Sequence, residues 1–168
     1  MTSTDASLPQ VARGAVPFCT VTGTCYRAVD PRYRSAALAG SRAAGRFSPP
    51  GAPALYLSSS PEGVATAMIA HRSARSAELD VLGFRVAATR IVDLRDHALL
   101  AGLDIDPADA AAPWQEIVAD GGTPPSWQVR DRLVELGAHG LIDPSRKRPG
   151  LWHLTLFEWD DRVVSPLA

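Results

Sequence analysis

A loop punctuated by glycine and proline holds the residues best suited to chemistry in this chain. The run Gly45-Arg46-Phe47-Ser48-Pro49-Pro50-Gly51 presents Arg46 close to Ser48, and Tyr56 follows ten residues after the arginine. A guanidinium group matches the geometry of a phosphate, and glycine and proline restrict the backbone that presents it. Tyr56, at the start of a predicted strand, offers a flat face for a base or a pyridine ring. The pattern predicts a site for a phosphorylated aromatic molecule such as a nucleotide; the alternative is an ordinary turn without a ligand.

A second basic loop lies near the end of the chain. Asp143-Pro144-Ser145-Arg146-Lys147-Arg148-Pro149-Gly150 again places hydroxyl and cationic groups beside a predicted strand. If the two loops meet in the fold, they form a cationic cleft that suits a diphosphate. On charge alone, a solvated basic turn is the favoured interpretation of this second loop.

Composition narrows the class of protein. The chain has 168 residues, 46% of them hydrophobic and 21% charged, which suits one globular domain with a real core. The net charge of -1 argues against binding nucleic acid or a membrane through bulk charge. Cys19 and Cys25 have no partner pair for a zinc site, so no metal is expected. The N-terminus lacks the apolar stretch of a signal peptide, which predicts a cytoplasmic protein.

The predicted elements mix strands and helices without regular βαβ spacing. Residues 1–17 are predicted to be a flexible tail and residues 18–168 a single domain. Predicted strands cover residues 20–29, 54–58, 78–86, 90–94, 141–142 and 151–159. Predicted helices cover residues 61–75, 96–103, 107–120 and 127–136, with Ser60 and Ser126 as N-caps. This succession favours an α+β fold over a parallel α/β sheet.

Other notable side chains have simpler explanations. His71 lies on the apolar face of the predicted helix 61–75, where it is either a general base or a packed core residue. The chain's tryptophans are expected in the core or at a partner interface; they are Trp114, Trp127, Trp152 and Trp159.

At this point the sequence resembles the RES domain family, bacterial toxins of type II toxin–antitoxin pairs that consume NAD. Short segments in the family's order carry the resemblance: Tyr26-Arg27, Gly45-Arg46-Phe47, Tyr56, Ser60-Pro61 with His71, Gly140 with Pro144-Ser145, and the closing strand Leu154 to Phe157. They extend over about Cys25 to Asp160, nearly the whole chain. The resemblance implies an ADP-ribosyltransferase-like fold with a split, two-sheet core and flanking helices. A chance match in an unrelated soluble protein is the competing explanation.

The resemblance also implies roles for individual residues. Arg46 would bind the diphosphate of NAD or hold the reacting ribose, and Arg27 would support a phosphate. Ser48 belongs to the same binding loop. Tyr56 would stack near the nicotinamide, and Ser145 would hydrogen-bond the nucleotide.

One position departs from the family pattern. The family carries a glutamate eleven residues after the strand tyrosine, where this chain has Ala67. Such a carboxylate stabilises the positive charge on the ribose as nicotinamide leaves, and losing a group of this kind often costs ~10²–10³ in rate. Ala67 is either an engineered change, a natural variant, or a sign that another acid serves. Glu62 is a poor substitute because it lies about 140° away around the helix, whereas Glu78 and Asp143 stay open.

The sequence therefore predicts a toxin that cleaves the nicotinamide–ribose bond of NAD, its substrate. The acceptor of ADP-ribose is phosphate, water or a target protein. The resemblance implies a cognate antitoxin as partner, with no direct contact to nucleic acid or membrane. The alternative is a catalytically inactive module that binds NAD or an antitoxin, because the family glutamate is Ala67 here.

Overall fold

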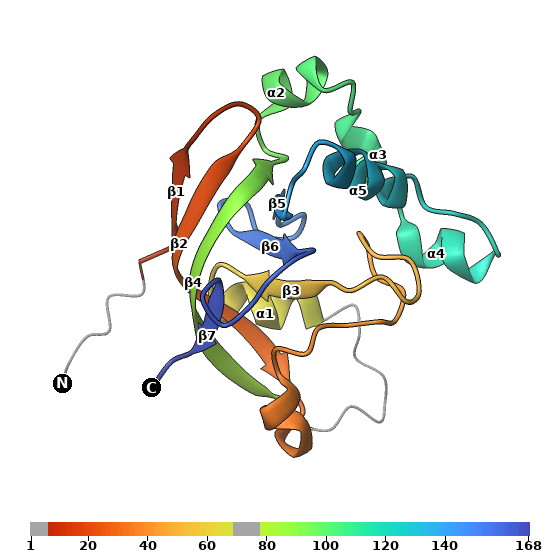
Figure 1. Ribbon diagram of the computed structural model, residues 1–168. Coiled ribbons are helices and arrows are strands. Elements are labelled where there is room, and N and C mark those ends of the chain that lie inside the picture. The colour runs from red at the N-terminus through yellow and green to blue at the C-terminus, as the bar shows by residue number, and fades with distance from the viewer. Residues whose placement is uncertain (1–6, 69–77) are drawn as a thin grey trace.

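The computed structural model describes residues 7–68 and 78–168, which fold around a strongly curved β-sheet (Figure 1). The strands are β1 (Gln10–Arg13), β2 (Cys19–Val29), β3 (Leu55–Ser58), β4 (Asp80–Asp93), β5 (Gly140–Pro144), β6 (Trp152–Leu156) and β7 (Val164–Pro166). The helices are the 3-10 helix η1 (Pro31–Ala36) and the α-helices α1 (Pro61–Met68), α2 (His97–Gly102), α3 (Pro107–Ala111), α4 (Trp114–Ala119) and α5 (Pro125–Glu135). The predicted α+β class is confirmed.

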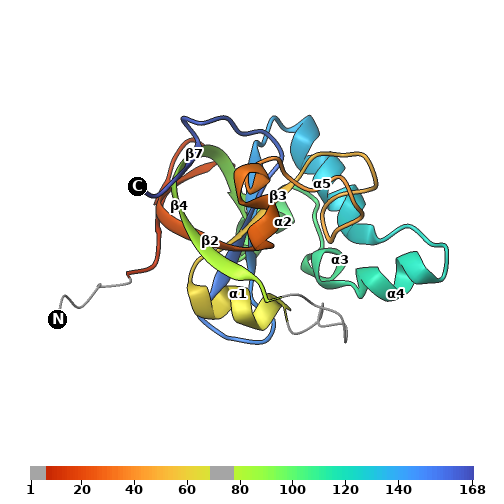
Figure 2. The ribbon, with the colours of Figure 1, turned by 90° about the horizontal axis from the view of Figure 1, so that it is seen from below.

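The sheet closes on itself. Its strand order is β1-β2-β3-β6-β5-β4-β7, and a further pairing of β2 with β4 joins five of these strands into a ring. Figure 2 shows β2 and β4 curling around one side of the molecule while α3, α4 and α5 gather on the other. The β4–β5 pairing is parallel, and the other strand pairs are antiparallel.

The expected division into two sheets needs correction, because the described strands form one sheet. The pairing between β2 and β3 is the weakest in the ring, because these two strands pair only at Tyr26 and Ser58. On the other side of the ring, β4 and β5 pair from Ile91–Gly140 to Asp93–Ile142. The 14 residues of β4 make this possible, because the strand is long enough to bend and pair with both β2 and β5.

Strand alternation separates the core from the site. Leu55 and Leu57 of β3 point into the barrel, where they join a buried apolar cluster with Leu154 of β6. Tyr56 and Ser58 consequently point to the opposite face. A second apolar cluster packs α2, α3 and α5 against that face and includes Leu100, Ala110, Leu133 and Leu141.

Three predicted boundaries are wrong. Gln10–Arg13 pairs with β2 as strand β1, so the tail is shorter than residues 1–17. The two strands predicted over residues 78–86 and 90–94 are a single strand, β4, which begins at Asp80 and ends at Asp93. Ala87 and Ala88 continue its pairing with β2, and no glycine or proline interrupts the strand between residues 87 and 90. The helix predicted over 107–120 divides at Pro113, since proline cannot donate a helical hydrogen bond and Ala112 before it is extended.

The helix ends follow their capping residues. Ser60 accepts a hydrogen bond from the backbone N–H of Gly63 at 3.0 Å, as expected of the N-cap of α1. Ser126 does not cap α5, because Pro124 occupies that position and the Ser126 hydroxyl bonds elsewhere. No helix in the two described stretches is long and apolar enough to cross a membrane.

Candidate functional site

A cavity of about 580 Å³ lies against the outward face of β3, β5 and β6. This volume is within the range of small-molecule sites. Its rim includes α1 on one side and the start of α4 on the other, which stand apart in both views (Figures 1 and 2). The ionisable groups of lysine, arginine, histidine and aspartate along its wall are Arg27, Arg46, Asp143, Arg146, Lys147 and His153. Within the described part of the chain, four cationic side chains therefore face one carboxylate.

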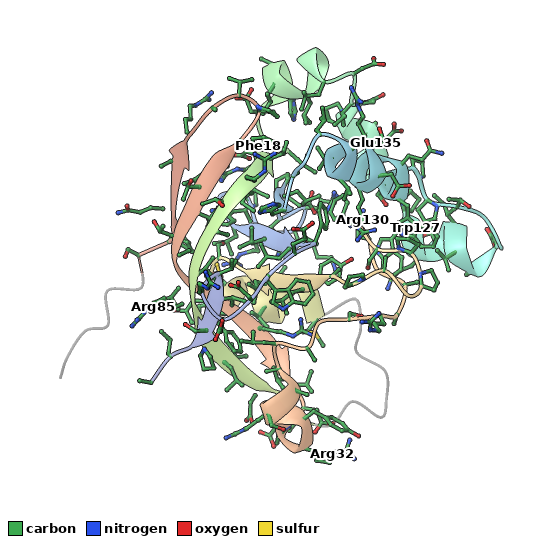
Figure 3. All side chains as sticks on the ribbon, viewed as in Figure 1. Phe18, Arg32, Arg85, Trp127, Arg130 and Glu135 are labelled. Carbon is green, nitrogen blue, oxygen red and sulfur yellow. The ribbon has the colours of Figure 1, made fainter. Side chains whose placement is uncertain are left out.

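The backbone of the Gly45–Ser48 turn is held from several sides. Gly45 and Ser48 exchange backbone hydrogen bonds of 2.8 and 3.3 Å. From α5, the Trp127 indole N–H donates to the Gly45 carbonyl at 2.8 Å, and the buried Ser126 hydroxyl donates to the carbonyl of Arg46. Trp127 and its helix neighbour Arg130 lie against this loop in Figure 3. The turn is thus a rigid mount for the Arg46 side chain.

The Arg46 guanidinium is half-buried and faces the end of α3. Its Nη1 donates to the carbonyls of Ala110 at 3.1 Å and Ala112 at 2.9 Å. Burial, and secondarily the charge of Arg146, lower the pKa of Arg46, but an arginine remains protonated at neutral pH. Since these two bonds use only Nη1, the N–H groups on Nε and Nη2 remain free for an anion as far as the described residues go.

The second basic loop meets the first at α3. Arg146 donates to the same Ala110 carbonyl at 2.8 Å and forms a two-pronged pair with Asp143, at 2.9 and 3.1 Å. Asp143 is only 4% exposed, so its charge is neutralised in place by Arg146. The meeting of the two loops that the sequence left conditional therefore occurs.

Arg27 adds a cation that the fold leaves incompletely satisfied. Its Nη1 is buried and has no hydrogen-bond partner among the described residues. Burial lowers the pKa of this guanidinium. An unpaired buried donor destabilises a fold, and an anionic ligand in the cavity would satisfy it.

Tyr56 lines the cavity, but its hydroxyl is engaged in the fold. It lies 2.6 Å from the Ser48 hydroxyl and accepts a hydrogen bond from the Phe47 backbone N–H at 3.2 Å. Burial raises the pKa of Tyr56, which keeps it a neutral phenol. Ser48 is fully buried behind Tyr56 and outside the cavity wall, so it supports the tyrosine from behind the wall.

Ser145 and Ala67 both line the cavity, from two different elements. Ser145 follows β5, and its hydroxyl accepts a hydrogen bond from the Arg148 backbone at 3.3 Å. Ala67 lies on α1 and lines the cavity, so the position where the resemblance implies a glutamate belongs to the wall. His71 lies outside the described residues.

The acids that could replace a glutamate at position 67 are now placed. Glu62 pairs with Arg148, and neither Glu62 nor Glu78, which precedes β4 by two residues, lines the cavity. Asp143 does line it, but Arg146 holds both its oxygens. The one carboxylate in the described wall is therefore already neutralised.

His153 is a cavity residue that sequence reasoning missed. It lies on β6 directly opposite Ser58 on β3 and opposite Asp143 on β5. Its Nδ1 is 2.9 Å from the Ser58 hydroxyl. Burial lowers the pKa of His153, and the nearby cations oppose the raising effect of Asp143. The signal was available, since alternation in the closing strand places His153 on the same face as Thr155 and opposite to Leu154.

Comparison with known proteins places the chain. The RES domain family matches residues 24–166. The fold is similar to a chain in the crystal structure of the M. tuberculosis MbcT–MbcA toxin–antitoxin complex, with a TM-score of 0.52 and 19% sequence identity over 80% of this chain and 73% of that one. No curated protein matches the sequence. Because the family match extends over most of the chain and includes the residues that build the cavity, this protein belongs to the RES domain family.

Proposed function

We propose that this protein is the toxin of a toxin–antitoxin pair, and that it binds NAD in the cavity and cleaves the nicotinamide–ribose bond. One observation carries the proposal most directly: in a RES domain chain, a cavity of suitable size gathers Arg27, Arg46, Arg146 and Lys147 against a single described carboxylate. Such a wall suits a ligand with two phosphates, because arginine forms paired, charge-assisted hydrogen bonds to phosphate oxygens.

The chain's residues divide the work of the proposed reaction. Arg46 binds the diphosphate through its Nε and Nη2 groups, and Arg27 contributes the buried Nη1 that lacks a partner in the described fold. Tyr56 presents its ring to the nicotinamide end, and Ser145 hydrogen-bonds the nucleotide. Holding the dinucleotide in one geometry lowers the entropic part of the barrier.

Bond cleavage leaves positive charge on the ribose. The C1′–N bond breaks with its electron pair going to the nicotinamide nitrogen, so nicotinamide leaves as a neutral molecule. The ribose carbon then accepts an oxygen of phosphate or water, or a protein side chain. At position 67 this chain supplies no carboxylate to stabilise the cationic ribose, so we expect slow chemistry unless that acid is restored.

Ala67 also favours a second function. The protein would then be an inactive domain that retains the NAD site or binds an antitoxin. The cationic wall supports NAD binding in either case, because it does not depend on position 67. A cognate antitoxin is the proposed partner, in keeping with the toxin–antitoxin complex named for the similar fold.

Binding is tested by replacing Arg46. Arg46→Ala should weaken NAD binding by tenfold or more, because hydrogen bonds to a charged group contribute about 1.5–3 kcal/mol. Isothermal titration calorimetry measures the affinity. Arg42→Ala is the matched control, since Arg42 is an exposed arginine on the same loop that does not line the cavity.

The two variants separate a specific contact from a change in overall charge. Arg42→Ala removes the same charge and should bind NAD like the unmodified protein. Equal affinity for NAD in both variants and the unmodified protein would exclude Arg46 as the diphosphate ligand, and absence of NAD binding to the unmodified protein would refute the proposed function.

A further inference from the structure

Trp114 is an aromatic cavity residue to which the proposed reaction assigns no role. It is the first residue of α4, lines the cavity and is half-buried. Within the described residues it belongs to neither buried apolar cluster, and its indole N–H makes no hydrogen bond. The chain therefore holds a large apolar ring at the cavity rim without the packing that usually stabilises one.

The other tryptophans are accounted for by the fold. The indole of Trp127 donates to the Gly45 carbonyl and that of Trp159 to the Leu38 carbonyl, both at 2.8 Å. Trp152 is 3% exposed inside the barrel cluster. Of the two expected positions, core or partner interface, Trp114 does not occupy the core, because it lines the cavity.

One carbonyl connects Trp114 to the phosphate-binding arginine. The Ala112 carbonyl accepts from the Trp114 backbone N–H at 2.8 Å and from Arg46 Nη1 at 2.9 Å. Pro113, between Ala112 and Trp114, separates α3 from α4, and the chain bends there. The short segment that carries the indole ring therefore also holds the Arg46 guanidinium by hydrogen bonds, although Arg46 itself comes from the Gly45–Ser48 turn. This arrangement places a flat apolar side chain on the segment that contacts an anion-binding group.

The orientation of a bound dinucleotide can be inferred from the residues at the α1 side and the α4 side of the cavity. Ala67, at the position where the family's glutamate acts on the reacting ribose, lies on α1, whereas Trp114 lies on α4 across the site (Figures 1 and 2). A dinucleotide with its nicotinamide ribose at α1 and its diphosphate on Arg46 would extend its other end to α4. We propose that Trp114 is the stacking surface for the adenine ring; this assignment rests on the proposed function.

Binding of two fragments of NAD tests the assignment. ADP-ribose contains the adenine, and nicotinamide mononucleotide does not. Trp114→Ala should weaken ADP-ribose binding about tenfold, a typical effect of removing an aromatic side chain from a stacked base. It should leave the affinity for nicotinamide mononucleotide unchanged, and Trp114→Phe should restore most of the ADP-ribose affinity because a smaller ring still stacks. Calorimetry on the full chain measures all of these.

Glu116→Ala is the matched control, because Glu116 is exposed on the same helix and does not line the cavity. Equal affinity of Trp114→Ala and the unmodified protein for ADP-ribose would overturn the assignment. A parallel loss of nicotinamide mononucleotide binding would also overturn it, because the ring would then serve the nicotinamide end or only support Arg46. If the unmodified protein binds neither fragment nor NAD, the proposed function fails together with the inference; if NAD binds and the tryptophan has no effect, only the inference fails.

Discussion

The Ser58–His153 pair is the site's most informative contact at the scale of single residues. Ser58 and His153 face each other across β3 and β6, and Asp143 is the partner of His153 on its other side. Burial, with Arg146 and Arg46 nearby, outweighs Asp143 and lowers the pKa of His153. His153 is consequently a neutral imidazole at neutral pH, able to accept or donate a hydrogen bond within the cavity.

This lowered pKa predicts a loss of stability in mild acid. Well above pH 6.5, His153 is neutral in both the folded and the unfolded chain, so its titration does not change the free energy of unfolding. As the pH falls below that value, the unfolded chain binds a proton that the folded chain does not, so the free energy of unfolding decreases. Between pH 7.5 and 5.5 the decrease should reach at most about 1.4 kcal/mol.

Urea unfolding at the two pH values measures this decrease. His153→Gln should remove it, whereas His97→Gln, at an exposed position on α2, should keep it. If His153→Gln retains the full pH dependence, another group is responsible and the neutral state assigned to His153 is wrong.

At the scale of elements, the Gly45–Ser48 turn depends on a close backbone approach. A Cβ atom at Gly45 would lie 2.4 Å from the Tyr56 hydroxyl oxygen and 2.8 Å from the Ser48 hydroxyl oxygen. Those two hydroxyl groups bond each other, and the Tyr56 hydroxyl also accepts a hydrogen bond from the Phe47 backbone N–H. Glycine at this position is therefore required by space and not by a positive φ angle.

Gly45→Ala should destabilise the protein by about 1–3 kcal/mol, the usual cost of adding a methyl group to a tightly packed place. It should also weaken NAD binding, because the same turn presents Arg46. Chemical denaturation and calorimetry measure the two effects. Gly102→Ala is the control: nothing lies within 4 Å of its Cβ position, so we expect a change of less than about 1 kcal/mol. If Gly45→Ala keeps the stability and the NAD affinity of the unmodified protein, the turn can accommodate a Cβ atom and the predicted steric requirement for glycine is wrong.

At the scale of the whole molecule, the sequence predicted features set by neighbouring residues better than it predicted contacts between distant residues. The strand containing Leu55, Tyr56 and Leu57 was predicted correctly, because the alternation of buried and less buried side chains in a strand can be recognised from adjacent residues. The turn chemistry of residues 45–51 likewise pointed to Arg46 as a cavity residue. Both signals lie within a few residues of the groups that they identify.

What could not be predicted depends on residues far apart in the chain. The contact of Arg46 with the Ala110 carbonyl spans 64 positions, and that of Ser58 with His153 spans 95. Closure of the sheet through β2 and β4 is equally non-local. Strand β1 was missed because its four residues carry almost no apolar pattern and gain stability only from β2.

The cavity wall is assembled from many parts of the molecule. The fold assembles a cationic cavity from β2, β3, β5, β6, α1, the turn that carries Arg46 and the start of α4, and the cations in its wall do not depend on the side chain at position 67. The fold is thus compatible with the proposed NAD site even though position 67 holds an alanine. Under this proposal, a glutamate at position 67 should convert binding into catalysis.

The most direct test is nicotinamide release from NAD by the purified chain and by Ala67→Glu, each with and without phosphate. We predict that Ala67→Glu releases nicotinamide at least ~100-fold faster than the unmodified chain, the effect expected of one electrostatic group at the transition state. Dependence on phosphate would identify the acceptor. Release by neither protein, with NAD still bound, would contradict the account of a toxin lacking its acid and leave the binding domain as the function.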